Sequence, residues 1–208
     1  MNNGIRVTGR SGSSIEGFAS GVRRVLLPRA EKTDAVNGLA LFEFELEENG
    51  PRLTNGARIV TAVEELPSAL EAYTQFDAKA GCFRLALSTR SYKRLVDGDS
   101  RGTFTLCHEI GHLVLHRGTL KHLGQLPHRE LMLTRGENTH RPFEDSEWQA
   151  NRFASALLMP AAGLEVLRAR DRLDEENVSD HFHTSYTASE IRIREFNDKR
   201  EELLRVAK

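Results

Sequence analysis

The chain has 208 residues, of which 39% are hydrophobic and 28% are charged, which suits one medium-sized globular domain or one domain with a short appendage. Its 29 basic and 30 acidic side chains give a net charge of −1, so overall charge gives no reason to expect binding to nucleic acid or a membrane surface. Apolar runs fall far short of the ~20 residues of a membrane span, no secretory signal is evident, and two cysteines are too few for a disulfide scaffold. We therefore expect a cytoplasmic globular protein.

The first quarter of the chain predicts one helix and one strand. Apolar residues recur at helical spacing over residues 15–26, after Ser13 and Ser14, either of which can cap the helix. Residues 41–47 alternate between apolar side chains and glutamates, which is typical of a half-buried strand with an acidic outer face.

A small sheet and then a series of helices are expected next. Three runs favour strands, at residues 57–63, 70–76 and 82–87. The segments between them are too short for a crossover helix, so an antiparallel meander is the simplest arrangement. Everything after residue 100 indicates helix and loop, which makes the chain α+β.

No linker divides the chain into two independent domains. We describe it as an N-terminal helix and strand (1–50), a core (51–162) and a C-terminal helical segment that packs on the core (163–208).

Residues 108–112 read His-Glu-Ile-Gly-His, an HExxH motif within a predicted helix. Two histidines four residues apart share one helix face, with Cβ atoms about 5–6 Å apart, so both can bind one zinc ion. Glu109 is rotated by about 100° from His108 and can reach a water at the metal without being a ligand. Burying these side chains together would be costly without a cation. The alternative is that both histidines are core residues with ordinary hydrogen-bond partners. The motif therefore predicts a zinc site with His108 and His112 as ligands.

A third ligand is expected because a catalytic zinc site uses three protein ligands and one open position. Glu147 is the favoured candidate, since Ala150 and Ala154 follow it on a small-residue face that can approach another helix closely. Glu144 and Asp145 are rival carboxylates.

Both segments resemble a known family. The run Phe-Thr-Leu-Cys-His-Glu-Ile-Gly-His-Leu-Val-Leu-His and the later Glu-x-x-Ala-Asn-x-Phe-Ala-x-x-Leu-Leu-Met-Pro are similar to motifs of the ImmA/IrrE metallopeptidases, and the resemblance extends over residues 57–160. It implies a minimal zincin-like domain of the gluzincin type, in which a small antiparallel sheet packs with an HExxH helix and a following helix that bears the glutamate. It also implies that His108, His112 and Glu147 bind zinc and that Glu109 is the catalytic base.

The resemblance further implies an intracellular zinc metallo-endopeptidase. Several family members cleave a helix-turn-helix repressor that is encoded beside them in mobile elements or stress-response operons, so we expect such a protein substrate. The strand predicted at residues 82–87 would offer an edge on which an extended substrate adds as a strand. His116, His140, Arg141 and Tyr92 are candidates for a second electrophilic group, and none is assigned that role.

Two other functions are weighed against the peptidase. One is a zinc-dependent module that binds the repressor without hydrolysis, although Glu109 has no purpose at such a site. The other is direct DNA binding, which the mixed charge of the predicted final helix disfavours. Residues 78–143 are rich in basic side chains, which would suit an acidic partner or reflect ordinary surface variation.

Overall fold

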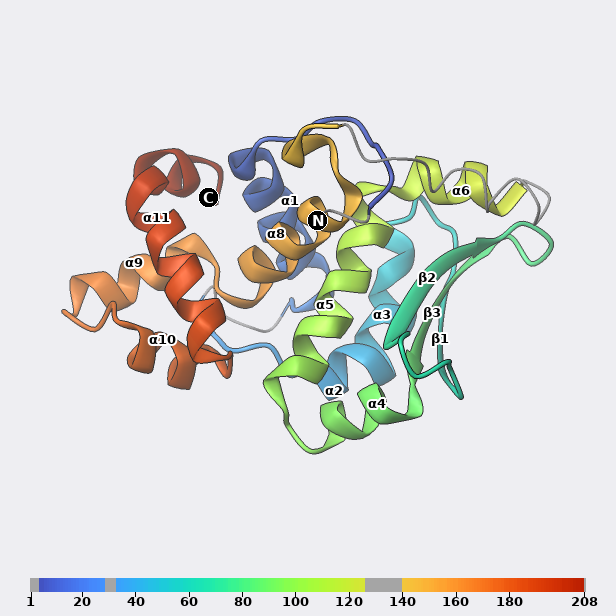
Figure 1. Ribbon diagram of the computed structural model, residues 1–208, viewed down its shortest axis with the longest axis horizontal. Coiled ribbons are helices and arrows are strands. Elements are labelled where there is room, and N and C mark those ends of the chain that lie inside the picture. The colour runs from blue at the N-terminus through green and yellow to red at the C-terminus, as the bar shows by residue number, and fades with distance from the viewer. Residues whose placement is uncertain (1–3, 29–32, 126–139, 208) are drawn as a thin grey trace.

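The computed structural model describes residues 4–28, 33–125 and 140–207, and it has an α+β fold, as predicted (Figure 1). The strands are β1 (Ile59–Glu64), β2 (Ala72–Asp77) and β3 (Cys82–Ser88). The described helices are α1 (Gly12–Leu26), α2 (Gly38–Ala40), α3 (Leu46–Asn49), α4 (Thr89–Val96), α5 (Ser100–Leu115), α6 (Arg117–Gln125), α8 (Ser146–Leu158), α9 (Ala161–Ala169), α10 (Glu175–Phe182) and α11 (Tyr186–Val206). Short helical turns span Leu41–Glu45, Gly50–Arg52 and Pro142–Glu144.

Helix α5 is the centre of the molecule. It lies between the sheet on one side and α8 on the other, and α1 and α11 pack beyond α8 (Figure 1). The face of α5 that meets these layers is buried, with Leu106, Ile110 and Leu113 fully enclosed. The HExxH segment is therefore on a helix that is held from both sides.

The sheet is mixed, and the predicted antiparallel meander is wrong in one respect. The strand order is β1-β3-β2, with β3 parallel to β1 and antiparallel to β2. The hairpin formed by β2 and β3 folds back so that β3 lies between the other two strands. Residues 65–71 need only cross the width of one strand at the same end of the sheet, so the parallel pair forms without a crossover helix.

Residues 41–47 are helical, so the strand predicted there is also wrong. Asn37 caps the segment by accepting a hydrogen bond from the Ala40 N–H, and a π-helical turn continues into α3. Leu41, Phe42 and Leu46 are buried, whereas Phe44, which the alternation places on the inner face, is 61% exposed. Tertiary packing on this one helical face overrides a local alternation that is equally compatible with a strand.

Helix α1 begins slightly before the predicted capping residues, Ser13 and Ser14. Ser11 caps α1, Asp99 caps α5 and Ser185 caps α11, each by accepting a backbone N–H on its side chain. Several neighbouring residues in each segment have capping side chains, so composition places the cap only to within a few positions.

A buried ion pair attaches the N-terminal helix to the C-terminal one. Arg192 on α11 donates to Glu16 on α1 at 2.7 Å, and both side chains are 1% exposed. Glu16 also accepts from the Ala161 N–H at the start of α9, and Arg192 donates to the Met159 carbonyl. These added hydrogen bonds offset part of the cost of desolvating the two charges.

None of the helices in the described ranges is both long enough and apolar enough to cross a membrane.

Close contact between α5 and α8 depends on a glycine. A Cβ atom placed on Gly111 would lie 3.1 Å from the Ala150 Cα and 3.1 Å from a ring carbon of Phe153. Both contacts are tighter than ordinary van der Waals packing, and one of them is to backbone. A glycine opposite an alanine therefore sets the small separation of these two helices.

We expect Gly111→Ala to destabilise the protein relative to Gly118→Ala, whose added Cβ would have no neighbour within 4 Å. Both substitutions gain helix propensity, but only the first crowds α8, so their free energies of unfolding should differ by about 1–3 kcal/mol. Urea denaturation of the two variants measures this difference, and equal values would show that α8 is not held at this contact.

Candidate metal centre

Three side chains converge at one point between α5 and α8. The Nε2 atoms of His108 and His112 are 3.0 Å apart. Glu147, in the first turn of α8, places Oε2 3.1 Å from Nε2 of His108 and Oε1 3.3 Å from Nε2 of His112. The structure thus brings together the three residues predicted as ligands, two from one helix and one from the other.

This arrangement suits a divalent metal ion. When an ion is bound tetrahedrally through bonds of about 2.0–2.1 Å, its ligand atoms lie about 3.3 Å from one another. The observed separations of 3.0–3.3 Å are close to that value. Two imidazoles and a carboxylate are also a donor set that zinc prefers, so the residues fit the ion.

The electrostatics of the site favour a cation. Hydrogen bonds from His108 and His112 hold the pKa of Glu147 far below its usual range, against the opposing effect of burial. Burial would lower the pKa of His108, but the hydrogen bond to Glu147 and the charges of Glu109 and Glu147 outweigh it and raise that pKa. The carboxylates therefore stabilise positive charge at the point where the three side chains meet.

Hydrogen bonds behind the two histidines select the tautomer that leaves Nε2 free to bind a metal. Nδ1 of His108 lies 2.9 Å from Oδ1 of Asn151, an acceptor, so this nitrogen carries the proton. Nε2 of a neutral His108 then has its lone pair available.

His112 is oriented through a longer chain of contacts. Gln149 donates its amide to the carbonyls of Thr8 and Phe143, which turns its Oε1 toward Nε2 of His116 at 3.2 Å. His116 must therefore donate from Nε2 and accept at Nδ1, which lies 3.2 Å from Nδ1 of His112. That contact leaves Nε2 of His112 unprotonated, as metal binding requires.

His116 has the burial that this role needs. It is 4% exposed. Burial, together with the neighbouring His112, lowers its pKa to about 4, so it is neutral at physiological pH. The sequence did not indicate the hydrogen bonds that link Gln149, His116 and His112. The role of Gln149 depends on which groups it faces in the folded protein, and no sequence motif marks it.

Glu109 is held beside the metal centre by the sheet. It is 8% exposed, and its Oε2 accepts a hydrogen bond of 2.8 Å from the Thr74 hydroxyl on β2. A donor atom of Glu109 lies within 4.8 Å of those of His108 and His112. Sequence reasoning missed Thr74, which lies 35 residues away from Glu109 in the chain.

The rival carboxylates have other partners. Glu144 pairs with Arg6 at 3.2 Å, while Asp145 caps α8 through the Trp148 N–H and contacts His140 at 2.8 Å. Their environments explain why Glu147, rather than either neighbour, meets the histidines.

Tyr92 and Arg141, the remaining candidates for a second electrophilic group, contact other residues. Tyr92 donates to Glu43 on the surface at 2.6 Å, and Arg141 lies over the Phe143 ring. Residues 126–139 of the basic segment 78–143 lie outside the described residues.

A cavity of about 680 Å³ opens beside His108 and Glu109. Its wall is formed by α4, the first half of α5 and the start of β2. The predicted substrate edge at β3 is wrong, since β3 has a strand on each side; β2 is the edge strand that packs against α5.

The segment that contains α5 and α8 is similar to a known protein family. Residues 97–194, which contain both α5 and α8, match the Peptidase_M78 model, an IrrE N-terminal-like domain. A solved Mycobacterium tuberculosis transcriptional regulator is similar with a TM-score of 0.42 and 15% identity over 86% of this chain and 49% of that one, so the chain spans about half of its length. A search of curated proteins found no significant match. The match of residues 97–194 to this model is consistent with the resemblance to ImmA/IrrE metallopeptidases.

Proposed function

We propose that this protein is a zinc-dependent metallo-endopeptidase. The observation that carries the proposal is the meeting of His108, His112 and Glu147 at one point, with Glu109 beside them and a cavity in front. Three ligands leave a fourth position for water and substrate, which distinguishes a catalytic zinc site from a closed structural one.

When bound, zinc would lower the pKa of a water molecule and polarise a substrate carbonyl. Glu109 accepts a proton from the attacking water and returns it to the leaving amine. The Thr74 hydroxyl holds Oε2 of Glu109 and leaves Oε1 to exchange the proton. Asn151 and His116 keep the two histidines in the required tautomer.

The substrate that we propose is a helix-turn-helix repressor in the cytoplasm. The motif resemblance supports this choice, since several family members cleave such proteins. An extended segment of the substrate would pair with β2, the edge strand beside α5, rather than with β3. The competing proposal is a module that binds zinc and the repressor without hydrolysis. It differs from the peptidase proposal only in that Glu109 does not act as a base.

Glu109→Gln should retain one zinc ion per chain and lose cleavage by about 10²–10⁴-fold, because the base is removed while the ligands stay. Zinc content and cleavage of the repressor encoded by a neighbouring gene provide the two measurements. Glu48→Gln, at an exposed position, is the matched control and should cleave normally. If wild type and variant bind zinc and repressor equally but neither cleaves, the binding module replaces the peptidase.

Glu147→Gln should weaken zinc binding, because it removes the one charged ligand but preserves the size of the side chain. We expect a loss of at least about tenfold in affinity, measured by competition with a chromophoric chelator. Unchanged affinity would show that Glu147 is not a ligand.

His116→Phe should lower zinc affinity by about 10–100-fold, since the Nδ1 proton of His112 would lose its acceptor. His122→Phe, at an exposed position on α6, is the control. The same chelator competition applies, and equal affinities for the two variants would rule out the chain through Gln149.

A further inference from the structure

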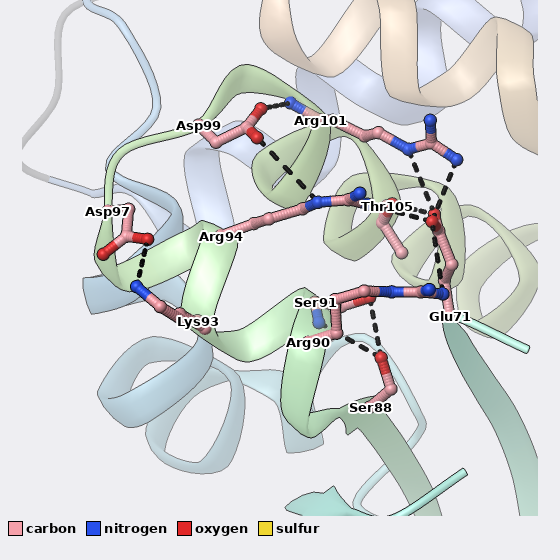
Figure 2. Close-up of polar contacts among 10 residues, drawn as sticks. All are labelled: Glu71, Ser88, Arg90, Ser91, Lys93, Arg94, Asp97, Asp99, Arg101 and Thr105. Atoms are coloured by element: carbon pink, nitrogen blue, oxygen red, sulfur yellow. Dashed lines mark hydrogen bonds and ion pairs between the residues drawn. The ribbon is translucent and has the colours of Figure 1, made fainter. Parts of the chain in front are cut away.

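Three arginines are among the residues that line the cavity beside Glu109. Figure 2 shows them gathered around Glu71. Arg90 and Arg94 come from α4, four residues apart, and Arg101 comes from the first turn of α5. All three surround Glu71, which precedes β2. Arg94 and Arg101 each donate to Glu71 Oε1 at 2.9 Å, and Arg90 lies 3.8 Å from the same oxygen.

These arginines carry more charge than their carboxylate partners neutralise. In the described part of the chain, the carboxylates within 4 Å of the three guanidinium groups are those of Glu71 and Asp99, which is 3.9 Å from Arg94. Three positive charges against two negative ones leave one in excess. A local excess of positive charge attracts ligands of negative charge.

The arginines are also accessible. The side chains of Arg90 and Arg101 are 51% and 64% exposed, whereas Glu71 is 22% exposed. Burial would raise the pKa of Glu71, but hydrogen bonds from Arg101 and Arg94 outweigh it, so this carboxylate stays ionised and keeps the cationic groups together. Each guanidinium has five N–H donors, more than Glu71 can occupy.

Arg101 stands where a basic residue is locally unfavourable. The first turn of α5 contains this arginine and no acidic residue, although the partial positive charge of a helix N-terminus favours the reverse. Such a local cost is expected where function requires the charge.

We propose, on the basis of the peptidase function proposed above, that Arg90, Arg94 and Arg101 form a subsite that binds a carboxylate of the substrate. Guanidinium groups recognise carboxylates through paired, charge-assisted hydrogen bonds. The carboxylate belongs to an aspartate or glutamate side chain or to the end of the substrate chain, and the two sources are separable by experiment.

The helix gives the distance of this subsite from the cleaved bond. Arg101, Thr105 and His108 share one face of α5, and seven residues separate Arg101 from the ligand His108. At about 1.5 Å per residue the subsite is about 10 Å from the metal centre. An extended peptide covers about 3.3 Å per residue, so the acidic residue should lie about three residues from the scissile bond.

The test measures binding, so that it does not depend on turnover. The zinc-loaded Glu109→Gln full chain, labelled with ¹⁵N, is titrated with a capped pentapeptide, acetyl-Ala-Ala-Glu-Ala-Ala-amide, and with its glutamine counterpart. The Glu peptide should bind more tightly by roughly threefold to tenfold, as expected of partly exposed ion pairs, and should shift the Nε–Hε signals of Arg90 and Arg101. A third peptide, acetylated pentaalanine with a free carboxyl end, tests the other source, and preference for it alone would assign the subsite to the chain end.

Two variants separate recognition from a structural role. Adding Arg90→Gln and Arg101→Gln should abolish the preference, whereas Arg90→Lys with Arg101→Lys, which keeps the charge but not the paired donors, should retain part of it. Lys93→Gln is the matched control, because Lys93 is on α4 but does not line the cavity, and it pairs with Asp97 rather than with Glu71 (Figure 2). A loss of stability without a change in preference would mean that the arginines only tie β2 to the helices.

The outcomes also separate this inference from the peptidase function. Equal affinity for all three peptides, including no binding of any, overturns the carboxylate subsite, even if a repressor is cleaved. A preference for a carboxylate peptide that disappears in the double glutamine variant supports the subsite, even if no substrate is cleaved. Failure to cleave any substrate would count against hydrolysis alone.

Discussion

The close packing of α5 against α8 is the constraint on which the rest of this structure depends. His108 and His112 are on one helix and Glu147 is on the other, so the three side chains of the proposed metal centre meet only if the two helix axes approach closely. Gly111 and Ala150 allow that approach because neither presents a side chain larger than a methyl group at the contact. The HExxH motif therefore contains both histidines proposed as ligands and the packing residue that brings Glu147, the proposed third ligand, to them.

Burial makes the centre chemically defined as well as geometrically close. A histidine in water exchanges between tautomers, whereas Nδ1 of His108 and Nδ1 of His112 each face a group that determines where the proton lies. The amide of Gln149 is oriented by two backbone carbonyls, and this orientation is transmitted through the buried, neutral His116 to His112. The N-terminal segment takes part through Thr8, although it lies outside the matched family segment.

The sheet serves the site mainly through its edge. Because β3 is inserted between β1 and β2, the edge strand next to α5 is β2, and its Thr74 holds Glu109. Glu71, just before the same strand, gathers the arginines at the end of the cavity. One short strand thus links the proposed base to the proposed carboxylate subsite, and both are reached from the same opening.

The sequence by itself determined the features that depend on local spacing. Helical periodicity and the four-residue interval placed His108 and His112 on one face, and the small residues after Glu147 indicated a helix that packs closely. The α+β order and the positions of the three strands also followed from local patterns. Only the tertiary structure decided the rest, because it depends on contacts between distant residues: the parallel pairing of β1 with β3, the helical state of residues 41–47, the bond from Thr74 to Glu109, and the convergence of the arginines on Glu71. A short pattern states which face a side chain occupies, but the group it meets there is set by the packing of the whole chain.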